Sequence, residues 1–180
     1  MVKPLLLQCK FILVEWLSIS YGLIPNPLRK YYLRCFSINV GKGSSIHRGC
    51  KFFHVEKLRI GENSVVNFGC YFDNRRGIMI GNNVGIAHNT KIYTLGHNIE
   101  SPEFKAKGAP FVIEDDAFIF SNSLIIPDVT IHRGAIVLAG SVVTQDVEAW
   151  TVVGGNPAKV IKERQKKIAY KQKYNYWFAL

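Results

Sequence analysis

Residues 113–143 read IEDDAFIFSNSLIIPDVTIHRGAIVLAGSVV and contain a repeat with a period of six. An aliphatic residue stands at every sixth position: Ile113, Ile119, Ile125, Ile131, Val137 and Val143. Upstream, three triplets keep the same spacing: Val40/Ile46/Phe52, Ile60/Val66/Phe72 and Ile80/Ile86/Ile92. A period of six matches neither the 3.6 residues of a helix turn nor the alternation of a simple strand. The repeat therefore predicts an all-β solenoid of short strands and tight turns around an apolar interior.

A second periodic feature supports the solenoid. Four residues after the aliphatic position stands a small or β-branched residue, which would fit a corner: Ser44, Cys50, Ser64, Cys70, Val84, Thr90, Ala117, Ser123, Val129, Ala135 and Ser141. The interval from Ile80 to Ile113 is longer than the earlier ones. Its excess lies at about 93–112, in YTLGHNIESPEFKAKGAPFV, which predicts an extruded loop. Such loops are usually functional.

The composition limits the partners. The chain has 180 residues, 23 Lys+Arg against 13 Asp+Glu and a net charge of +10, which favours an anionic partner. A hydrophobic content of 48% excludes a disordered chain. No pair of the four cysteines has CxxC spacing, so reduced thiols in the cytoplasm are the simpler interpretation. No helix-turn-helix, RNP-like or P-loop motif accompanies the charge, and we expect no nucleic-acid partner.

The two ends differ from the repeat. Residues 1–37 are apolar and predict a helical segment, but Lys10 and Glu15 argue against a membrane span. Two alternatives stay open: a helix packed on its own protein or a neighbouring subunit, or an interfacial membrane helix, which the basic cluster Arg29, Lys30 and Arg34 supports. Residues 163–180 predict a basic helix and an aromatic tail that docks on the protein or on a bilayer.

Two segments of the middle part, residues 38–162, carry a family resemblance. AGSVVT at 139–144 and GGNPAKVI at 154–161 resemble the hexapeptide-repeat acyltransferases, and most closely the sugar and polysaccharide O-acetyltransferases of the maltose and galactoside types. The resemblance implies a left-handed parallel β-helix, a homotrimer, and acetyl-CoA bound in the groove between neighbouring prisms.

The resemblance also implies site residues. His97 matches the family's catalytic histidine, and a neutral imidazole suits removal of a hydroxyl proton at neutral pH. The alternative is a solvent-exposed loop histidine. Asn67, Asp73 and Asn74 match acceptor-binding or base-orienting positions, although an Asp-Asn pair also forms ordinary turns.

The cofactor residues come from the same comparison of motifs. Ser121, Ala139 and Thr144 match positions that meet the pantetheine arm, whereas Lys159 and Lys162 match cations that reach the nucleotide phosphates. The two lysines could instead belong to a solvated basic tail.

Three departures from the family pattern weaken the cofactor assignment slightly. Gln145 replaces a common lysine, Phe120 replaces a glycine beside the cofactor channel, and His132 occupies a turn position, where we interpret it as structural. His47, His54 and His88 show no convincing zinc pattern, so we expect no metal.

The sequence thus predicts an acetyl-CoA-dependent O-acetyltransferase acting on a saccharide or lipid-linked glycan in capsule or lipopolysaccharide synthesis. We expect it in the cytoplasm, with peripheral contact at the inner membrane face. Alternatives are an N-acetyltransferase acting on an amino sugar, and a non-catalytic β-helix module for binding or assembly.

Overall fold

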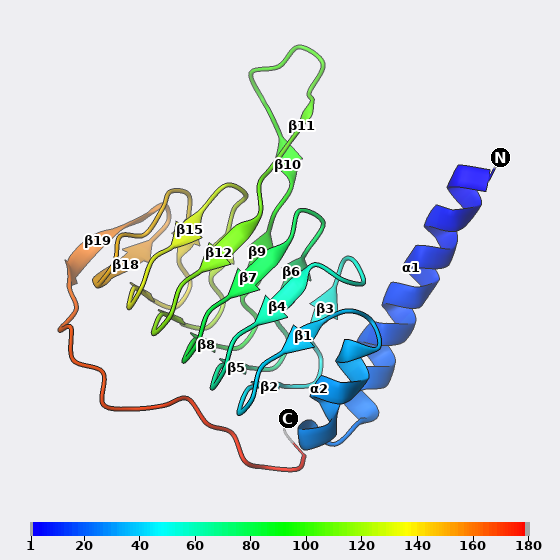
Figure 1. Cartoon of the computed structure of the whole chain (residues 1–180). Coiled ribbons are helices and arrows are strands. Elements are labelled where there is room, and N and C mark those ends of the chain that lie inside the picture. Colours follow the sequence, from blue (N-terminus) through cyan, green and yellow to red (C-terminus); the bar gives the residue numbers. More distant parts are fainter. Residues whose placement is uncertain (1, 179–180) are drawn as a thin grey trace.

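The computed structural model describes residues 2–178 and shows a three-sided solenoid with helices at its N-terminal end (Figure 1). The helices are α1 (Val2–Ser20), the short 3-10 helix η1 (Tyr21–Leu23) and α2 (Asn26–Arg34). Two short strands, β10 (Gly96–His97) and β11 (Ala106–Lys107), pair antiparallel in a hairpin that projects from the solenoid. The expected helical segment at the N-terminus is therefore present.

Three sheets form the faces of the solenoid. Sheet A contains β1 (Asn39–Val40), β4 (Leu58–Ile60), β7 (Ile78–Ile80), β12 (Phe111–Ile113) and β15 (Thr130–Ile131). Sheet B contains β2 (Ser45–Ile46), β5 (Val65–Val66), β8 (Gly85–Ile86), β13 (Phe118–Ile119), β16 (Ile136–Val137), β18 (Thr151–Gly155) and β19 (Ala158–Glu163). Sheet C contains β3 (Lys51–Phe52), β6 (Tyr71–Asp73), β9 (Lys91–Tyr93), β14 (Leu124–Ile125) and β17 (Val142–Val143). Apart from the antiparallel β18–β19 pair, these strands pair in parallel.

The hexapeptide positions form the core. Every predicted inward residue, from Val40 to Val143, is buried. Equivalent residues of successive coils stack in register, as Ile60 pairs with Ile80 and Ile80 with Ile113. Ten of the eleven predicted corner residues are buried, and Ser44 is partly buried. The Ser64 hydroxyl, for example, donates to the Gly81 carbonyl at 2.8 Å. The parallel β-solenoid predicted from the repeat is confirmed.

The extruded loop forms an arm over residues 94–110, at the corner where the chain passes from sheet C to sheet A. We call this the CA corner, and the corner between sheets B and C the BC corner. The ladders continue across the arm, since β7 pairs with β12 and β9 with β14. The arm is therefore an insertion between coils that does not interrupt their stacking.

The C-terminal segment differs from the prediction. Beyond β19 no helix forms within the described residues, and an extended tail runs back along the solenoid toward α2 (Figure 1). Lysines spaced four apart, such as Lys162/Lys166 and Lys167/Lys171, would repel each other on a helix. In the extended form, backbone groups bond to the solenoid instead: Gln172 N–H donates to the Asn83 side chain at 2.7 Å, and Asn83 donates to the Tyr170 carbonyl at 3.2 Å.

Candidate active site

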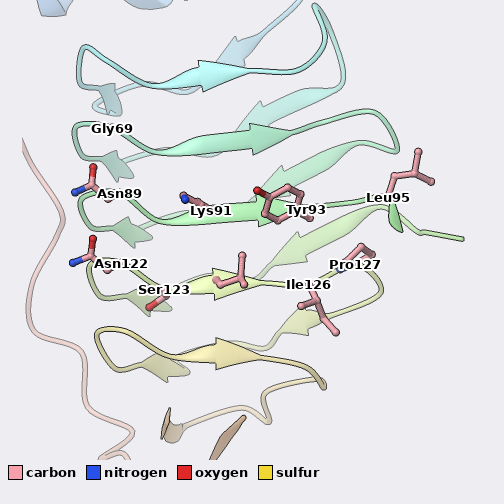
Figure 2. A pocket seen from close by; sticks show the side chains of 10 residues that line it. Gly69, Asn89, Lys91, Tyr93, Leu95, Asn122, Ser123, Ile126 and Pro127 are labelled. Atoms are coloured by element: carbon pink, nitrogen blue, oxygen red, sulfur yellow. The ribbon is translucent and has the colours of Figure 1, made fainter. Parts of the chain in front are cut away.

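An open groove of about 750 Å³ crosses the outer face of sheet C. Figure 2 shows Asn89 and Asn122 stacked at the BC corner, Lys91 and Tyr93 along β9, and Pro127 at the opposite edge. The strand residues alternate, so that Ile92 points into the core while its two neighbours point outward onto the groove floor. Gly69 and Ser123 line the BC-corner edge, whereas Leu95, Ile126 and Pro127 line the opposite edge. The groove is bounded by polar side chains on one edge and apolar ones on the other.

His97 lies on β10, near the base of the arm and beyond the apolar edge of the groove. Its ring is exposed and stacks on Phe104, with ring centroids 4.6 Å apart and planes 7° apart. The preceding Gly96 lies close to Pro127, which lines the groove, since a Cβ at Gly96 would be 3.6 Å from the Pro127 Cγ. The arm therefore holds an accessible imidazole whose orientation an aromatic neighbour restricts.

Asp73 lies on the CA corner one coil before the arm. Its carboxylate is fully buried and accepts two hydrogen bonds from Arg75, at 2.7 Å from Nε and 2.8 Å from Nη2. The Asp73 carbonyl accepts from the Thr94 hydroxyl at 2.6 Å, which ties this corner to the first residue of the arm. The bond to Asp73 raises the pKa of Arg75, and burial, followed by the charge of Asp73, raises the pKa of Tyr71. Arg75, unlike Asp73, is partly exposed to solvent.

Asn74 is also fully buried, but its partners are backbone groups. Its amide donates to the carbonyls of His54 at 2.7 Å and Glu56 at 2.6 Å, and its oxygen accepts from the His54 N–H at 2.8 Å. Both amide donors are thus used to hold the turn of the preceding coil, which is a structural arrangement.

The remaining predicted residues lie apart from His97 within one chain. Asn67, Ser121 and Ala139 lie at the BC corner, and Thr144 at the CA corner of the β17 coil. At about 3.3 Å per residue, one sheet face separates the corners by roughly 15–20 Å. Lys159 and Lys162 are exposed on β19, on a different face. A single chain brings Asp73 and the arm together, but not the BC corner or the lysines.

Two of the departures from the family pattern have a simple geometry. The Phe120 ring packs on Phe118, at 4.7 Å between centroids, on the outer side of sheet B, and it does not line the groove. His132 lies 3.2 Å from the Glu114 carboxylate at a turn, in agreement with a structural role. Within residues 2–178, no group of three His, Cys, Asp or Glu side chains has a geometry that would hold a metal ion.

Sequence reasoning missed the groove floor and Arg75. Lys91 and Tyr93 occupy outward positions beside a core isoleucine, and a polar-aromatic pair flanking that residue just before the insertion was the available signal. Arg75 is two residues after Asp73, a spacing that allows the observed ion pair.

Known proteins share both the repeat and the architecture. Residues 112–145 match the family model described as "Bacterial transferase hexapeptide (six repeats)". The structure is similar to a maltose O-acetyltransferase from Clostridium difficile 630, with a TM-score of 0.81 and 30% identity over 89% of each chain. It is also similar to a hexapeptide-repeat acetyltransferase from Vibrio cholerae O1 biovar eltor complexed with acetyl-CoA, with a TM-score of 0.73 and 28% identity over 85% of this chain and 86% of that one.

A curated relative matches a shorter segment. A 2,3,4,5-tetrahydropyridine-2,6-dicarboxylate N-acetyltransferase from Staphylococcus aureus (strain bovine RF122 / ET3-1) is 56% identical over 55 residues, which are 31% of this chain and 23% of that protein. The match thus spans less than a quarter of the length of that relative. Together with the likeness over almost the whole maltose O-acetyltransferase, these findings show that the chain belongs to the hexapeptide-repeat acyltransferases, whose fold is the left-handed β-helix.

Proposed function

We propose that the protein is an acetyl-CoA-dependent O-acetyltransferase that acts on a saccharide hydroxyl. The observation that carries this proposal is the arm, which places an exposed imidazole beside an open groove on sheet C. His97 would take the proton of the acceptor hydroxyl while its oxygen attacks the thioester carbonyl, and the carbon–sulfur bond then breaks to release the CoA thiol. The thioester already activates the acetyl group, so this step needs no covalent enzyme intermediate.

We assign the acceptor side of the site to the Asp73–Arg75 pair of one subunit and to Asn67, at the BC corner, of a neighbouring copy. Because the Asp73 carboxylate is buried and bonded, it positions Arg75, whose partly exposed guanidinium would meet the saccharide. We do not assign Asn74 to acceptor binding, because its side-chain amide donates to backbone carbonyls of the preceding coil.

The cofactor residues support a site shared between copies of the chain. Ser121 and Ala139 border sheet C at one corner, whereas Lys159 and Lys162 lie on β19 of sheet B, and Thr144 lies at the far corner. Thr144 and the pair Ser121 and Ala139 lie at opposite corners of sheet C, roughly 15–20 Å apart, so a corner of a second prism entering the groove would bring both sets onto one ligand. The family resemblance implies a homotrimer, and we propose one that binds acetyl-CoA in the grooves between its subunits.

A saccharide of a cell-surface polysaccharide, free or lipid-linked, is the acceptor we propose, with the reaction in the cytoplasm. The second candidate is N-acetylation of an amino sugar. It is favoured by the segment shared with the N-acetyltransferase from S. aureus. Both reactions would use the same base, and only the acceptor distinguishes them.

A thermal-shift titration with acetyl-CoA tests cofactor binding without an acceptor. Ligand at 100 times its Kd stabilises a site by about 2.7 kcal/mol, so the unfolding midpoint should rise saturably. We expect the same rise in His97→Ala and a smaller one in Lys159→Ala. No rise at millimolar acetyl-CoA would contradict the proposal.

An acceptor screen with hydroxyl and amino sugars tests the reaction. His97→Ala should lower turnover by roughly 10²- to 10⁴-fold, because the general base is lost. His132→Ala makes the same chemical change at a turn away from the groove and should keep near-wild-type turnover. Equal turnover in the two variants would show that His97 is not the base, and no turnover of the wild type with any acceptor would favour the non-catalytic β-helix module.

A further inference from the structure

Helix α1 buries only a narrow stripe on its own protein. Val14 and Leu17 of α1 and Tyr21 of the adjoining η1 are buried against the solenoid. Phe11 packs edge-on against Phe53 with centroids 6.3 Å apart. The Tyr21 hydroxyl fixes this end further, because it donates to the His47 carbonyl at 2.8 Å. In Figure 1 the N-terminal half of α1 extends beyond the solenoid.

The opposite side of α1 is apolar and exposed. Leu5, Ile12, Trp16 and Ile19, together with Leu23 of the adjoining η1, have between 62% and 80% of their surface exposed. Leu6, Cys9 and Leu13 widen this stripe. At about 100° per residue, the outward sector covers roughly 140° of the helix circumference.

No charge interrupts the outward sector. From Leu5 onward, the charged residues of α1 are Lys10 and Glu15, and both fall on its flanks. The segment Leu5–Leu23 is long and apolar enough to cross a membrane by length and composition. A span would, however, require the docked stripe of Val14, Leu17 and Tyr21 to leave the solenoid. The contacts therefore fit a helix that lies along a surface with one side covered by its own protein.

The C-terminal tail adds aromatic and basic residues near the C-terminal end of α1. The Asn26 N–H donates to the Trp177 carbonyl at 2.8 Å, which holds the tail beside the start of α2. The side chains of Tyr176, Trp177 and Phe178 remain exposed there. Aromatic rings of this kind favour the headgroup level of a bilayer.

Cations lie at the same end. Lys30 and Lys173 line one depression beside Asn26, and Arg34 is exposed at the end of α2, whereas Arg29 is buried and unavailable. The chain as a whole carries a net charge of +10. An apolar sector next to exposed aromatic rings and cations matches the surface of an anionic bilayer.

We infer that the outward sector of α1, together with the aromatic end of the tail, docks on the surface of an anionic lipid bilayer. A second copy of α1 is the other occupant to consider, since residues 5, 9, 12, 16, 19 and 23 have heptad spacing. The outward sector is wider than the coiled-coil seam that two apolar positions per heptad would form. Leu6 and Leu13 stand where charged residues usually flank such a seam. These features favour the bilayer.

Co-sedimentation of the full-length protein with vesicles tests the inference. Vesicles of phosphatidylcholine with about a third phosphatidylglycerol should bind the wild type, and added salt should weaken this binding. Ile12→Glu should reduce the bound fraction at least about tenfold. Gln8→Glu adds the same charge on the same exposed helix outside the sector and should bind within about twofold of the wild type.

Leu5→Glu is a second variant in the free half of α1, away from the residues docked on the solenoid. It should reproduce the loss even if Ile12→Glu disturbs folding, which circular dichroism would reveal. Sedimentation equilibrium without lipid tests the alternative, in which a second copy of α1 covers the outward sector. If Ile12→Glu dissociates an oligomer instead, or if the wild type ignores anionic vesicles, the inference is wrong. None of these measurements depends on acetyl transfer.

Discussion

His47 is a buried histidine that lies beneath the C-terminal tail. It is 4% exposed, its ring lies 4.1 Å from that of Tyr174, and its Nε2 has no hydrogen-bond partner among the described residues. Burial first, and then the charges of Arg29 and His88, lower its pKa to about 4. The folded state therefore holds this imidazole neutral.

The low pKa of His47 predicts a pH-dependent stability. The unfolded imidazole binds a proton near pH 6.5, so the contribution is complete above that pH and is lost as the pH falls toward 4. The free energy of unfolding should change by up to about 1.4 kcal/mol per pH unit in this range, and by about 3 kcal/mol in total at most. Denaturant unfolding between pH 7 and pH 4.5 should show a flatter slope in His47→Gln. His97→Gln, on the exposed arm, should keep the wild-type slope.

Individual residues of the site were predictable to different degrees. His97 was marked by its place in the single long insertion, and the structure puts it beside the groove. Asp73 and Asn74 were indistinguishable in the sequence, because neighbouring residues in a turn share the same spacing. Only side-chain partners separate them: Arg75 for the carboxylate, and backbone carbonyls for the amide.

Among the elements, the arm depends on a close contact at its base. A Cβ at Gly108 would lie 2.1 Å from the Thr94 carbonyl oxygen, so the strand leaving the arm passes directly over the residue that enters it. The Thr94 hydroxyl is held by Asp73 in turn. The orientation of β10 and β11 is thus fixed to the coil before the arm.

Gly108→Ala should therefore displace the base of the arm. Backbone atoms cannot move aside as a flexible side chain would, and overpacking of this kind costs about 1–3 kcal/mol. Gly96→Ala is the matched change, because its Cβ would meet only the Pro127 ring at 3.6 Å. Thermal unfolding should show a lower midpoint for Gly108→Ala and a near-wild-type midpoint for Gly96→Ala; equal midpoints would contradict this account of the base.

The strands were predictable because their period depends on local geometry. Each coil places an aliphatic residue at the same inward position, and the structure keeps that phase from Val40 to Val143. The C-terminal helix was wrong for the opposite reason. Its sequence has helix-forming residues, but the bonds to Asn83 that hold it extended come from a coil far away in the chain.

At the scale of the whole molecule, the tail connects distant coils of the solenoid. The Arg164 guanidinium donates to the carbonyls of Asp116 and Gly134, both at 2.9 Å, and further along the tail Tyr174 reaches His47 near the first coil. A solenoid otherwise has contacts only between neighbouring coils. The tail therefore couples the stability of the last coil to that of the first.

Truncation after residue 164 should weaken this coupling. Loss of the hydrogen bonds of the tail should lower the free energy of unfolding by about 2–4 kcal/mol and broaden the transition. A full-length variant with Lys166, Lys167 and Lys171 replaced by alanine removes charge but keeps the backbone contacts. It should unfold like the wild type; if it matches the truncated protein instead, charge rather than contact explains the effect.

The continuous ladders beneath the arm have a consequence for how such enzymes diversify. Since β7 meets β12 and β9 meets β14 as if no residues intervened, the length and composition of the arm are nearly independent of the packing of the coils. Evolution, or a protein engineer, would thus be free to exchange the arm, to which we assign contact with the acceptor, while retaining the faces that assemble the prism. New substrate preferences would then arise by grafting one hairpin.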